Sequence, residues 1–482
     1  MNAADLPRTP PSDAPSAFRP WWFADAYRRA APPPPQVLQG EHSCDVAIVG
    51  GGYTGLWTAI MLKQAQPQLR VALIEQDRIG AGASGRNGGC LLTWSAKYLT
   101  LRRLFGESEA LRLVRASEDA VYAIRDFCRR YAIDAEVRVD GALYTATNLS
   151  QRGSMQGVMA ALAAKEASSW RTLPIEQVQA LAGSTAMLEG VYSPAAGSVH
   201  PGLLVLGLAR VARELGVTIY EHSPMTALDS PRGHPAQLST PTGQLQARQV
   251  VLATNAWMGR QFREFAGTIA VVSSDMLITE PVPATLAELG LQHGAAVCDS
   301  RIFVHYWRST PDGRLMLGKG GNTFAFGGRM LAEFDQPSRY LPQLQQSLRR
   351  FFPALASVPI AASWNGASDR SVTGFPFFGR LSGTDNVFYG FGYSGNGVGP
   401  SYLGGQILSS LVLGLDNAWT RSGLTHGPRG YFPPEPFRWV GSQLVRNAIR
   451  RKEAMEDREE APWWLDCQLA KLAQAAGKAD KG

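Results

Sequence analysis

The stretch CDVAIVGGGYTGLWTAIMLKQ, residues 44–64, decides the fold that this chain is expected to adopt. Its apolar run 46–49 predicts a strand, its glycines form the pattern Gly50-x-Gly52-x-x-Gly55, and apolar residues at helical spacing follow from Leu56. A second apolar run at 71–74 predicts another strand. The order strand, glycine turn, helix and strand is typical of a Rossmann-type dinucleotide-binding unit.

Each glycine of this turn has a separate expected purpose. Gly50 permits the tight turn, Gly52 lets a pyrophosphate approach the backbone, and Gly55 lets the helix pack closely on the strand. The positive end of the helix then faces the phosphates. Glu75 stands 20 residues after Gly55, where its carboxylate can accept hydrogen bonds from a ribose diol. A glycine turn without a ligand is the alternative, and the surrounding strands and helix disfavour it.

Two further glycine-rich loops favour FAD over NAD, which would use the same first turn. GAGASGRNGG, residues 80–89, has small residues that let the backbone approach a large flat cofactor, and Ser84 and Arg86 offer phosphate or ring contacts. GFGYSGNGVG, residues 390–399, precedes a predicted helix from about 402 to 413, whose positive end would stabilise charge on a reduced flavin. Each loop alone could be an ordinary turn, but together they predict FAD.

The predicted FAD contacts come from these three loops and from residues that follow the expected strands. Many are glycines or small polar residues, which leave the backbone open to a ligand. They are Gly50, Gly52, Tyr53, Thr54, Gly55, Glu75, Gln76, Ala83, Ser84, Arg86, Asn87, Gly88, Gly89, Met225, Asn255, Ala256, Gly392, Tyr393, Ser394, Gly395, Asn396 and Gly397.

The composition is that of an ordinary globular protein, and its charge pattern does not indicate nucleic-acid binding. Of 482 residues, 45% are hydrophobic and 18% charged, with a net charge of +7 that is spread along the chain. The densest basic run, 446–452, is followed at once by the acidic stretch 453–460, which predicts a solvated helix. No apolar run approaches the ~20 residues of a membrane-spanning helix, so no transmembrane segment is expected.

The five cysteines predict neither a metal site nor a disulfide framework, because they are widely spaced and odd in number. They are Cys44, Cys90, Cys128, Cys298 and Cys467. A reducing cytoplasm is therefore the expected location. The polar, proline-rich start of the chain also lacks the apolar core of a secretory signal.

The length predicts two intertwined domains, because 482 residues exceed one small core. A discontinuous α/β, Rossmann-type FAD-binding domain is expected from residues 41–100, 190–260 and 366–420. An α+β substrate domain with an antiparallel sheet is expected from 101–189 and 261–365, inserted into the first.

The two ends of the chain are expected to lie outside these domains. Residues 1–40 predict an extended arm, because the four prolines at 32–35 cannot enter a helix, and the aromatic residues at 21–23 are expected to hold it against the body. Residues 421–482 predict a helical extension. Within the substrate domain, apolar spacing predicts one helix over about 99–130.

The three glycine-rich elements, in this order, resemble the FAD-dependent amine and D-amino-acid oxidase superfamily, which includes glycine oxidase, sarcosine oxidase and γ-glutamylputrescine oxidase. This resemblance covers roughly residues 44–415. A closer resemblance, to the aminophosphonate oxidoreductase group, runs through SGRNGGCLLTWSAKY (84–98), ASWNGASDRSVTGFPFFGRL (362–381) and the tail PPEPFRWVGSQLVRNAIRRKE (433–453). Residues 309–331 and 388–414 resemble that group as well.

The resemblance implies a reaction. In this superfamily a substrate C–N bond is oxidised by hydride transfer to flavin N5, and the imine is then hydrolysed to a carbonyl compound and an amine. For the closer group the implied substrate is 2-aminoethylphosphonate or an N-alkyl derivative, and the product is phosphonoacetaldehyde. Another amine such as γ-glutamylputrescine or glycine, and a non-catalytic flavoprotein subunit, are the alternatives.

The resemblance also bears on how FAD is held and on the partners. Some members tether FAD through a His beside the first turn or a Cys before the last loop, whereas here Arg86 and the Cys-free stretch 364–366 stand there. Noncovalent FAD is therefore expected. A small anionic amine is the expected substrate, with oxygen or another electron acceptor as oxidant, and the protein is expected to be a monomer or a small homo-oligomer.

Basic side chains in the substrate domain or at the flavin face are the candidates for binding an anionic amine. Arginine suits this task because its planar fork engages two oxygens at once. The catalytic candidates are Arg301, His305, Lys319 and Arg370, and Arg308 and Arg329 are also considered. Any one of them could instead be an ordinary surface or salt-bridged residue.

The run RIFVHYWR, residues 301–308, predicts a strand in which Arg301 and His305 lie on one face, with residues 302, 304, 306 and 308 on the other. The basic pair on one face predicts an anion clamp. Lys319, within the glycine turn 318–321, is expected either near the flavin, where it would promote reaction with oxygen, or facing solvent.

Overall fold

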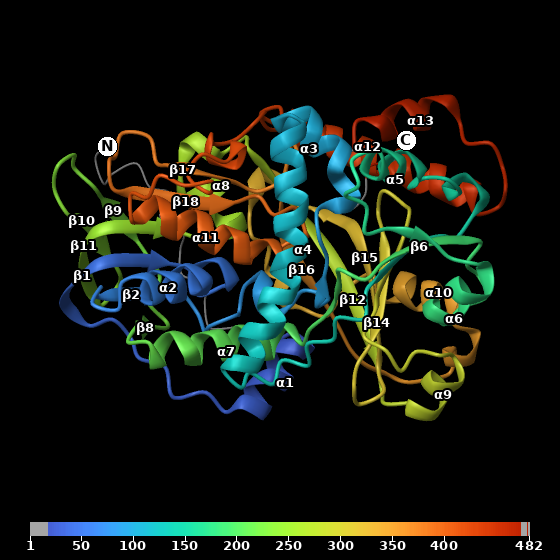
Figure 1. Ribbon diagram of the computed structural model, residues 1–482, viewed down its shortest axis with the longest axis horizontal. Coiled ribbons are helices and arrows are strands. Elements are labelled where there is room, and N and C mark those ends of the chain that lie inside the picture. The colour runs from blue at the N-terminus through green and yellow to red at the C-terminus, as the bar shows by residue number, and fades with distance from the viewer. Residues whose placement is uncertain (1–17, 474–479, 481–482) are drawn as a thin grey trace.

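The computed structural model describes residues 18–473 and residue 480 (Figure 1). Its strands form two eight-stranded sheets and a two-stranded ribbon. The first sheet takes its strands from residues 40–74, 218–252 and 377–391, and the second takes them from 142–193 and 269–371. Each sheet is therefore built from segments that are far apart in the sequence.

The first sheet contains the predicted dinucleotide-binding unit. Its strand order is β17-β18-β11-β1-β2-β8, and β9 and β10 join it through β11. The pairings among β18, β11, β1, β2 and β8 are parallel. The bounds are β1 Gly40–Val49, β2 Val71–Ile74, β8 Thr218–Tyr220, β9 Ala227–Asp229, β10 Ala236–Ser239, β11 Gly243–Leu252, β17 Phe377–Arg380 and β18 Val387–Phe391.

Three helices complete this unit: α2 (Tyr53–Ala65), α7 (Pro201–Glu214) and α11 (Pro400–Val412). Helix α2 packs against both of the others. It is buried on most of its surface because nearly all of its residues are apolar or small. The predicted order of strand, glycine turn, helix and strand over 46–74 is confirmed.

The second sheet has the order β16-β12-β15-β14-β13-β4-β6-β5. The expected antiparallel pairing holds for every neighbouring pair except β13 and β4, which are parallel. Strand β16 also runs across the expected domain boundary at residue 365. The bounds are β4 Ala142–Ala146, β5 Arg171–Thr172, β6 Glu189–Ser193, β12 Ile269–Thr279, β13 Ala296–Asp299, β14 His305–Ser309, β15 Leu315–Phe324 and β16 Ile360–Ser371.

Helices around the second sheet include α10, which packs on β12 and β15. The bounds there are α5 Gln156–Ala163, α6 Ile175–Ala182, α9 Pro283–Glu288 and α10 Leu341–Phe351, and a short α8, Met258–Gln261, follows β11. The ribbon pairs β3 (Cys90–Leu91) with β7 (Gly197–Ser198). The single helix expected over 99–130 is two helices, α3 (Tyr98–Phe105) and α4 (Glu107–Arg130), because Gly106 turns the chain with a φ of +82°.

The prediction of an extended N-terminal arm is wrong for residues 21–30. They form α1 (Trp21–Ala30), which packs against α7. The expectation that aromatic side chains hold this segment against the body is confirmed, since Trp22 is fully buried and Phe23 is nearly so. The prolines at 32–35 follow the helix in irregular chain, and residues 1–17 lie outside the described residues.

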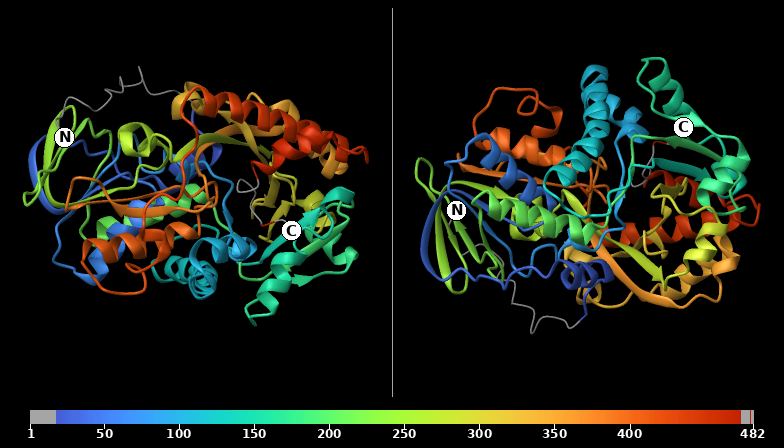
Figure 2. Two further views of the ribbon diagram at one scale, coloured as in Figure 1. Left: turned by 90° about the horizontal axis from the view of Figure 1, so that it is seen from above. Right: turned by 60° about the horizontal axis from the view of Figure 1, so that its bottom comes forward.

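The C-terminal extension forms α12 (Phe437–Glu456) and α13 (Trp464–Lys471), which pack on each other. Figure 2 shows both helices beside the second sheet, and α12 contacts β15. The prediction that this helix is solvated is wrong for one face of α12, where Ala448, Ile449 and Glu453 are buried. None of the described helices is both long and apolar enough to cross a membrane.

Candidate active site

A large cavity lies between the two sheets, at the carboxyl ends of the parallel strands. Val49 ends β1, Ile74 ends β2 and Ala253 follows β11, and all three line it. Met276 of β12 and Tyr306 of β14 line it from the second sheet. The space inside it, counted together with its open mouth, is about 1810 Å³. Open α/β sheets bind their ligands at this edge.

The first glycine turn has the backbone geometry that its sequence predicts. Gly50 has a φ of +112°, and a Cβ there would lie 2.6 Å from the oxygen of Ala253. A Cβ on Gly55 would lie 2.1 Å from the oxygen of Gly50, so only glycine permits this approach of α2 to the turn. Gly52 stands at the N-cap of α2 and has no side chain to cap it, while the Tyr53 N–H donates a hydrogen bond to Ser84 Oγ at 3.0 Å, and all three residues line the cavity. A helix N-terminus of this kind favours an anion.

Glu75, directly after β2, braces this turn through both carboxylate oxygens. Its Oε2 accepts a hydrogen bond from the Gly51 N–H at 2.7 Å, and its Oε1 accepts one from the Asp77 N–H at 3.0 Å. Burial raises the pKa of Glu75 to about 7, against the lowering effect of these N–H groups. The side chain lines the cavity, where its contact with a ribose stays a prediction.

Arg86 lines the cavity, but its guanidinium is bound to protein groups. Its Nε donates to the oxygen of Ala81 at 3.1 Å, Nη1 donates to the oxygen of Phe334 at 2.8 Å, and Nη2 pairs with Asp335 at 3.0 Å. The Trp364 indole donates in turn to the oxygen of Arg86 at 2.8 Å. This arginine therefore joins the 80–89 loop to the second sheet, and the geometry gives no support to a phosphate contact from its guanidinium.

The last glycine-rich loop is held by a buried carboxylate that the sequence analysis missed. Asp369 accepts hydrogen bonds from the N–H groups of Gly392, Tyr393 and Ser394, the last two at 3.2 Å. Burial raises the pKa of Asp369 to about 6, although these three bonds lower it. Ser394 takes a φ of +56°, a conformation that is unfavourable for a residue other than glycine. The hydrogen bond from its N–H to Asp369 helps to hold this conformation.

Most of the predicted cofactor contacts meet at this one cavity. Its lining includes Gly50, Gly52, Tyr53, Thr54, Glu75, Gln76, Ala83, Ser84, Arg86, Asn87, Gly88, Met225, Asn255, Tyr393, Gly395, Asn396 and Gly397. Five predicted positions lie behind the lining instead, and they are Gly55, Gly89, Ala256, Gly392 and Ser394. Gly55 and Gly392 shape the turns rather than the surface, since both lie where a Cβ would meet neighbouring atoms within 3 Å.

Other lining residues were missed for two different reasons. Ser223 and Trp257 follow β8 and β11, so the rule that ligands bind at strand ends could have found them. Met276 and Val304 come from the second sheet or the segment before it, and no local motif marks them.

Of the four catalytic candidates, Arg370 alone lines the cavity among the described residues. Its guanidinium lies between β15 and the last loop. A Cβ added at Gly320 of β15 would lie 3.7 Å from Nη2 of Arg370, and one added at Gly395 of the loop would lie 3.8 Å from it. Burial lowers the pKa of Arg370 to about 10, which leaves the guanidinium charged at neutral pH. Its backbone forms a bridge with Tyr393.

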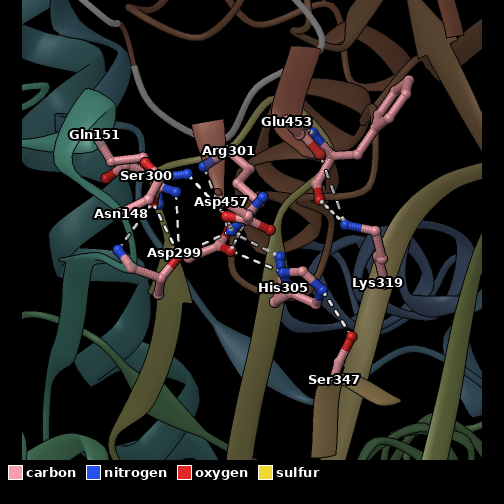
Figure 3. Close-up of polar contacts among 12 residues, drawn as sticks. Asn148, Gln151, Asp299, Ser300, Arg301, His305, Lys319, Ser347, Glu453 and Asp457 are labelled. Carbon is pink, nitrogen blue, oxygen red and sulfur yellow. Dashed lines mark hydrogen bonds and ion pairs between the residues drawn. The ribbon is translucent and has the colours of Figure 1, made fainter. Parts of the chain in front are cut away.

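Arg301, His305 and Lys319 are brought together, but away from the cavity (Figure 3). They belong to a buried ion network with Asp299, Glu453 and Asp457. The prediction of a strand over 301–308 is wrong for residues 301–304, because the strand β14 begins only at His305. Lys319 lies within β15 rather than on a turn, and it is buried rather than solvent-facing. The geometry gives no support to an anion clamp made of Arg301 and His305.

The two remaining basic candidates also lie outside the lining. Arg308 is fully buried and donates hydrogen bonds to the oxygens of Gly88 and Val199 at 2.9 and 2.8 Å, with its guanidinium 4.6 Å from the Trp22 ring centroid. Arg329 is exposed. Within the described part of the chain, no group of three or more His, Cys, Asp and Glu residues is arranged to hold a metal ion.

Comparison with known proteins gives this architecture a family. The family described as FAD dependent oxidoreductase, DAO, matches residues 45–411. The chain belongs to this family. As a DAO-family member it is an FAD-dependent oxidoreductase that acts on C–N bonds of amines.

Individual relatives cover most of the chain. Gamma-glutamylputrescine oxidoreductase of Escherichia coli (strain K12) is 30% identical over 391 residues, which is 79% of this chain and 86% of that protein. Glycine oxidase of Geobacillus kaustophilus is 24% identical over 386 residues, 77% of this chain and 93% of that protein. The crystal structure of glycine oxidase from Geobacillus kaustophilus superimposes with a TM-score of 0.66 at 23% identity, covering 80% of this chain and all of that one.

The cavity of this DAO-family protein fits FAD on its own geometry. The bare turn at Gly50 and the N-terminus of α2 at Gly52 suit a pyrophosphate, and the carboxyl group of Glu75 lies directly after β2, where a ribose contact is expected. The loop from Tyr393 to Gly397 lines the far part, before the N-terminus of α11.

Proposed function

We propose that this enzyme oxidises an aminoalkylphosphonate, namely 2-aminoethylphosphonate or an N-alkyl derivative, to phosphonoacetaldehyde. The observation that carries the proposal is the partly buried, charged guanidinium of Arg370 in the cavity wall. A partly buried cation attracts an anion more strongly than a fully exposed one, because less water screens the charge. The resemblance of residues 84–98 and 362–381 to the aminophosphonate oxidoreductase group favours a phosphonate over a carboxylate.

In this proposal the chain's own residues bind and orient the substrate. Arg370 holds the anionic end, and the apolar side chains of Met276, Ile302 and Val304 contact the rest of the molecule. FAD, when bound, would supply the oxidant that takes a hydride from the amine carbon. Water then hydrolyses the imine, so that amine, water and oxidised FAD give aldehyde, ammonia or alkylamine, and reduced FAD.

We further propose that FAD is held noncovalently by the three glycine-rich loops. Arg86 stands where a tethering His would be expected, and its guanidinium is bound to carbonyl oxygens and Asp335. Cys90 is the one cysteine in the cavity lining. Acid precipitation is expected to release all of the flavin into the supernatant, and flavin that stays with the protein and is lost in Cys90→Ser would refute this part.

A second substrate follows from the relatives. The E. coli protein that is 30% identical to this chain is named for γ-glutamylputrescine. That amine also carries a carboxylate, which Arg370 could bind in the same way. Glycine, named in another relative, is a smaller carboxylated amine.

An anaerobic titration of the flavin distinguishes these functions. The bleaching of flavin absorbance is followed with 2-aminoethylphosphonate, its N-methyl form, γ-glutamylputrescine and glycine. We expect the phosphonates to reduce the flavin at the lowest concentration. Reduction by the carboxylated amines alone would overturn the phosphonate assignment. A flavin that no amine reduces would indicate a non-catalytic subunit.

A further inference from the structure

The segment 300–304 joins β13 to β14 and forms part of the cavity wall, and we call it the wall loop. Its side chains face two environments, and Ile302 contacts both, since it also packs against the cluster of Phe303, Ile449 and Ala470. Ile302 and Val304 line the cavity. Arg301 and Phe303 are buried without lining it, next to the C-terminal helices. The wall loop is therefore shared between the substrate cavity and the C-terminal extension.

Asp299, the last residue of β13, ties the ends of the wall loop together. Its Oδ1 accepts hydrogen bonds from the N–H groups of Arg301 at 3.3 Å and His305 at 2.9 Å. Its Oδ2 accepts from Arg301 Nε at 2.9 Å and from His305 Nδ1 at 2.7 Å. Although burial raises it, the contacts with His305 and Arg301 hold the pKa of Asp299 below its usual range. The ends of the loop are thus fixed within the second sheet.

The middle of the wall loop is held by α12 instead. Glu453 Oε1 accepts a hydrogen bond from the Phe303 N–H at 3.4 Å, and Lys319 Nζ donates to the oxygen of Phe303 at 3.0 Å. Glu453 Oε2 and Lys319 Nζ lie 3.8 Å apart (Figure 3). The Phe303 ring packs with Ile449 of α12 and Ala470 of α13. Both backbone polar groups of Phe303 therefore depend on an ion pair that α12 completes.

A second carboxylate at the end of α12 reinforces this contact. Asp457 pairs with Arg301 and accepts hydrogen bonds from Asn148 Nδ2 at 2.9 Å and Arg350 Nη2 at 3.1 Å. Burial and the nearby Lys319 lower the pKa of His305 to about 4, so its imidazole is neutral at neutral pH. The network then balances, with Asp299, Glu453 and Asp457 opposite Arg301, Lys319 and Arg350.

We propose that α12 sets the shape of the substrate pocket by holding the wall loop, with Glu453 and Asp457 as positioning residues for Ile302 and Val304. The proposal rests on the proposed function, since the wall matters only where an amine binds. Ile302 and Val304 flank Phe303 directly, so a displacement of Phe303 moves both. A misplacement of about 1 Å can change turnover by up to about 100-fold. The C-terminal extension thereby takes part in substrate selection.

The test compares two carboxylates on the same helix. Glu453→Ala removes the acceptor for Phe303, and Glu453→Gln keeps an amide oxygen there while it removes the charge opposite Lys319. Glu456→Ala is the matched control, because Glu456 is similarly buried and pairs with Lys452 on α12. Val304→Ala serves as a direct change of the wall. Hydrogen exchange of the peptide over 300–304, FAD content, and kcat and KM for a small and a bulkier amine are measured.

We expect E453A to speed exchange of the 300–304 peptide and to raise KM for the small amine about tenfold. FAD content should stay unchanged, and the ratio of kcat/KM between the two amines should shift in the same direction as in V304A. E453Q should be intermediate and E456A unchanged. Unchanged exchange in both Glu453 variants, or faster exchange without a shift in selectivity, would overturn the proposal. If no amine reacts with the unmodified protein, the proposed function fails, while the exchange result still tests the contact between α12 and the loop.

Discussion

The hydroxyl of Thr54 donates a hydrogen bond to the hydroxyl of Tyr393 at 2.9 Å, although the two residues are 339 positions apart in the chain. Thr54 lies in the first turn of α2, and Tyr393 lies in the last glycine-rich loop, before α11. Both line the cavity. The bond therefore fixes the distance between the loop expected at the pyrophosphate and the loop expected at the flavin ring.

Replacing Tyr393 with phenylalanine should weaken FAD binding. A neutral hydrogen bond contributes about 0.5–1.5 kcal/mol, so Y393F is expected to raise the dissociation constant of FAD by about 2- to 10-fold. Fluorescence titration of FAD-free protein measures this constant. Tyr402→Phe on α11, outside the cavity lining, is the control, and an equal effect of both changes would contradict a specific role for the bond.

A single methyl group at Gly55 should abolish tight FAD binding. The added Cβ would lie 2.1 Å from the oxygen of Gly50, so α2 must move away from the turn. Overpacking of this kind typically costs about 1–3 kcal/mol. Gly441→Ala in α12, where no atom lies within 4 Å of the new Cβ, should instead be neutral or stabilise by up to about 1 kcal/mol. The thermal unfolding and the flavin content of G55A and G441A are measured and compared. Normal flavin content in G55A would refute the packing argument.

Glu75 should make the FAD-free protein less stable as the pH rises. Its pKa is raised by burial from 4.5 to about 7, whereas the unfolded chain ionises near 4.5. The contribution of Glu75 is therefore fully present below pH 4.5 and is lost as the pH rises through about 7. The change that Glu75 makes to the free energy of unfolding across this pH range is at most about 3 kcal/mol. Urea unfolding at pH 5 and pH 8 should show a smaller pH-dependent loss in E75Q than in the unmodified protein, and the same pH dependence in both would count against this assignment.

Arg370→Met should separate the binding of anionic amines from the binding of FAD. A hydrogen bond to a charged group contributes about 1.5–3 kcal/mol, so KM for anionic amines is expected to rise by about 10- to 150-fold. Arg370→Lys should recover part of this loss, because it keeps the charge without the planar fork. Arg329→Met, an exposed arginine outside the cavity lining, is the control. Loss of FAD from R370M, with KM unchanged in whatever enzyme remains loaded, would point to a role at the cofactor instead.

The sequence by itself determined the dinucleotide turn, because the forces that shape the turn are local. Gly50 takes a φ of +112°, and a Cβ on Gly55 would meet the oxygen of the nearby Gly50, so both features follow from the local glycine spacing. The contacts of Gly50 with Ala253 and of Gly52 with Ser84 come from tertiary packing. The loops at 80–89 and 390–399 were found in the same way, since small residues in a short run indicate close backbone approach.

The tertiary structure decided which face of residues 301–308 meets the cavity. Alternation correctly separates residues 302, 304 and 306 from Arg301 and His305, but periodicity does not say which set faces the ligand. That choice depends on charge: a buried Arg301 needs carboxylates, and Asp299 supplies one from two positions away, whereas Asp457 at the end of α12 supplies another from 156 positions away. The distant partner, Asp457, is chosen by packing between separate elements, and no local pattern in the chain records it.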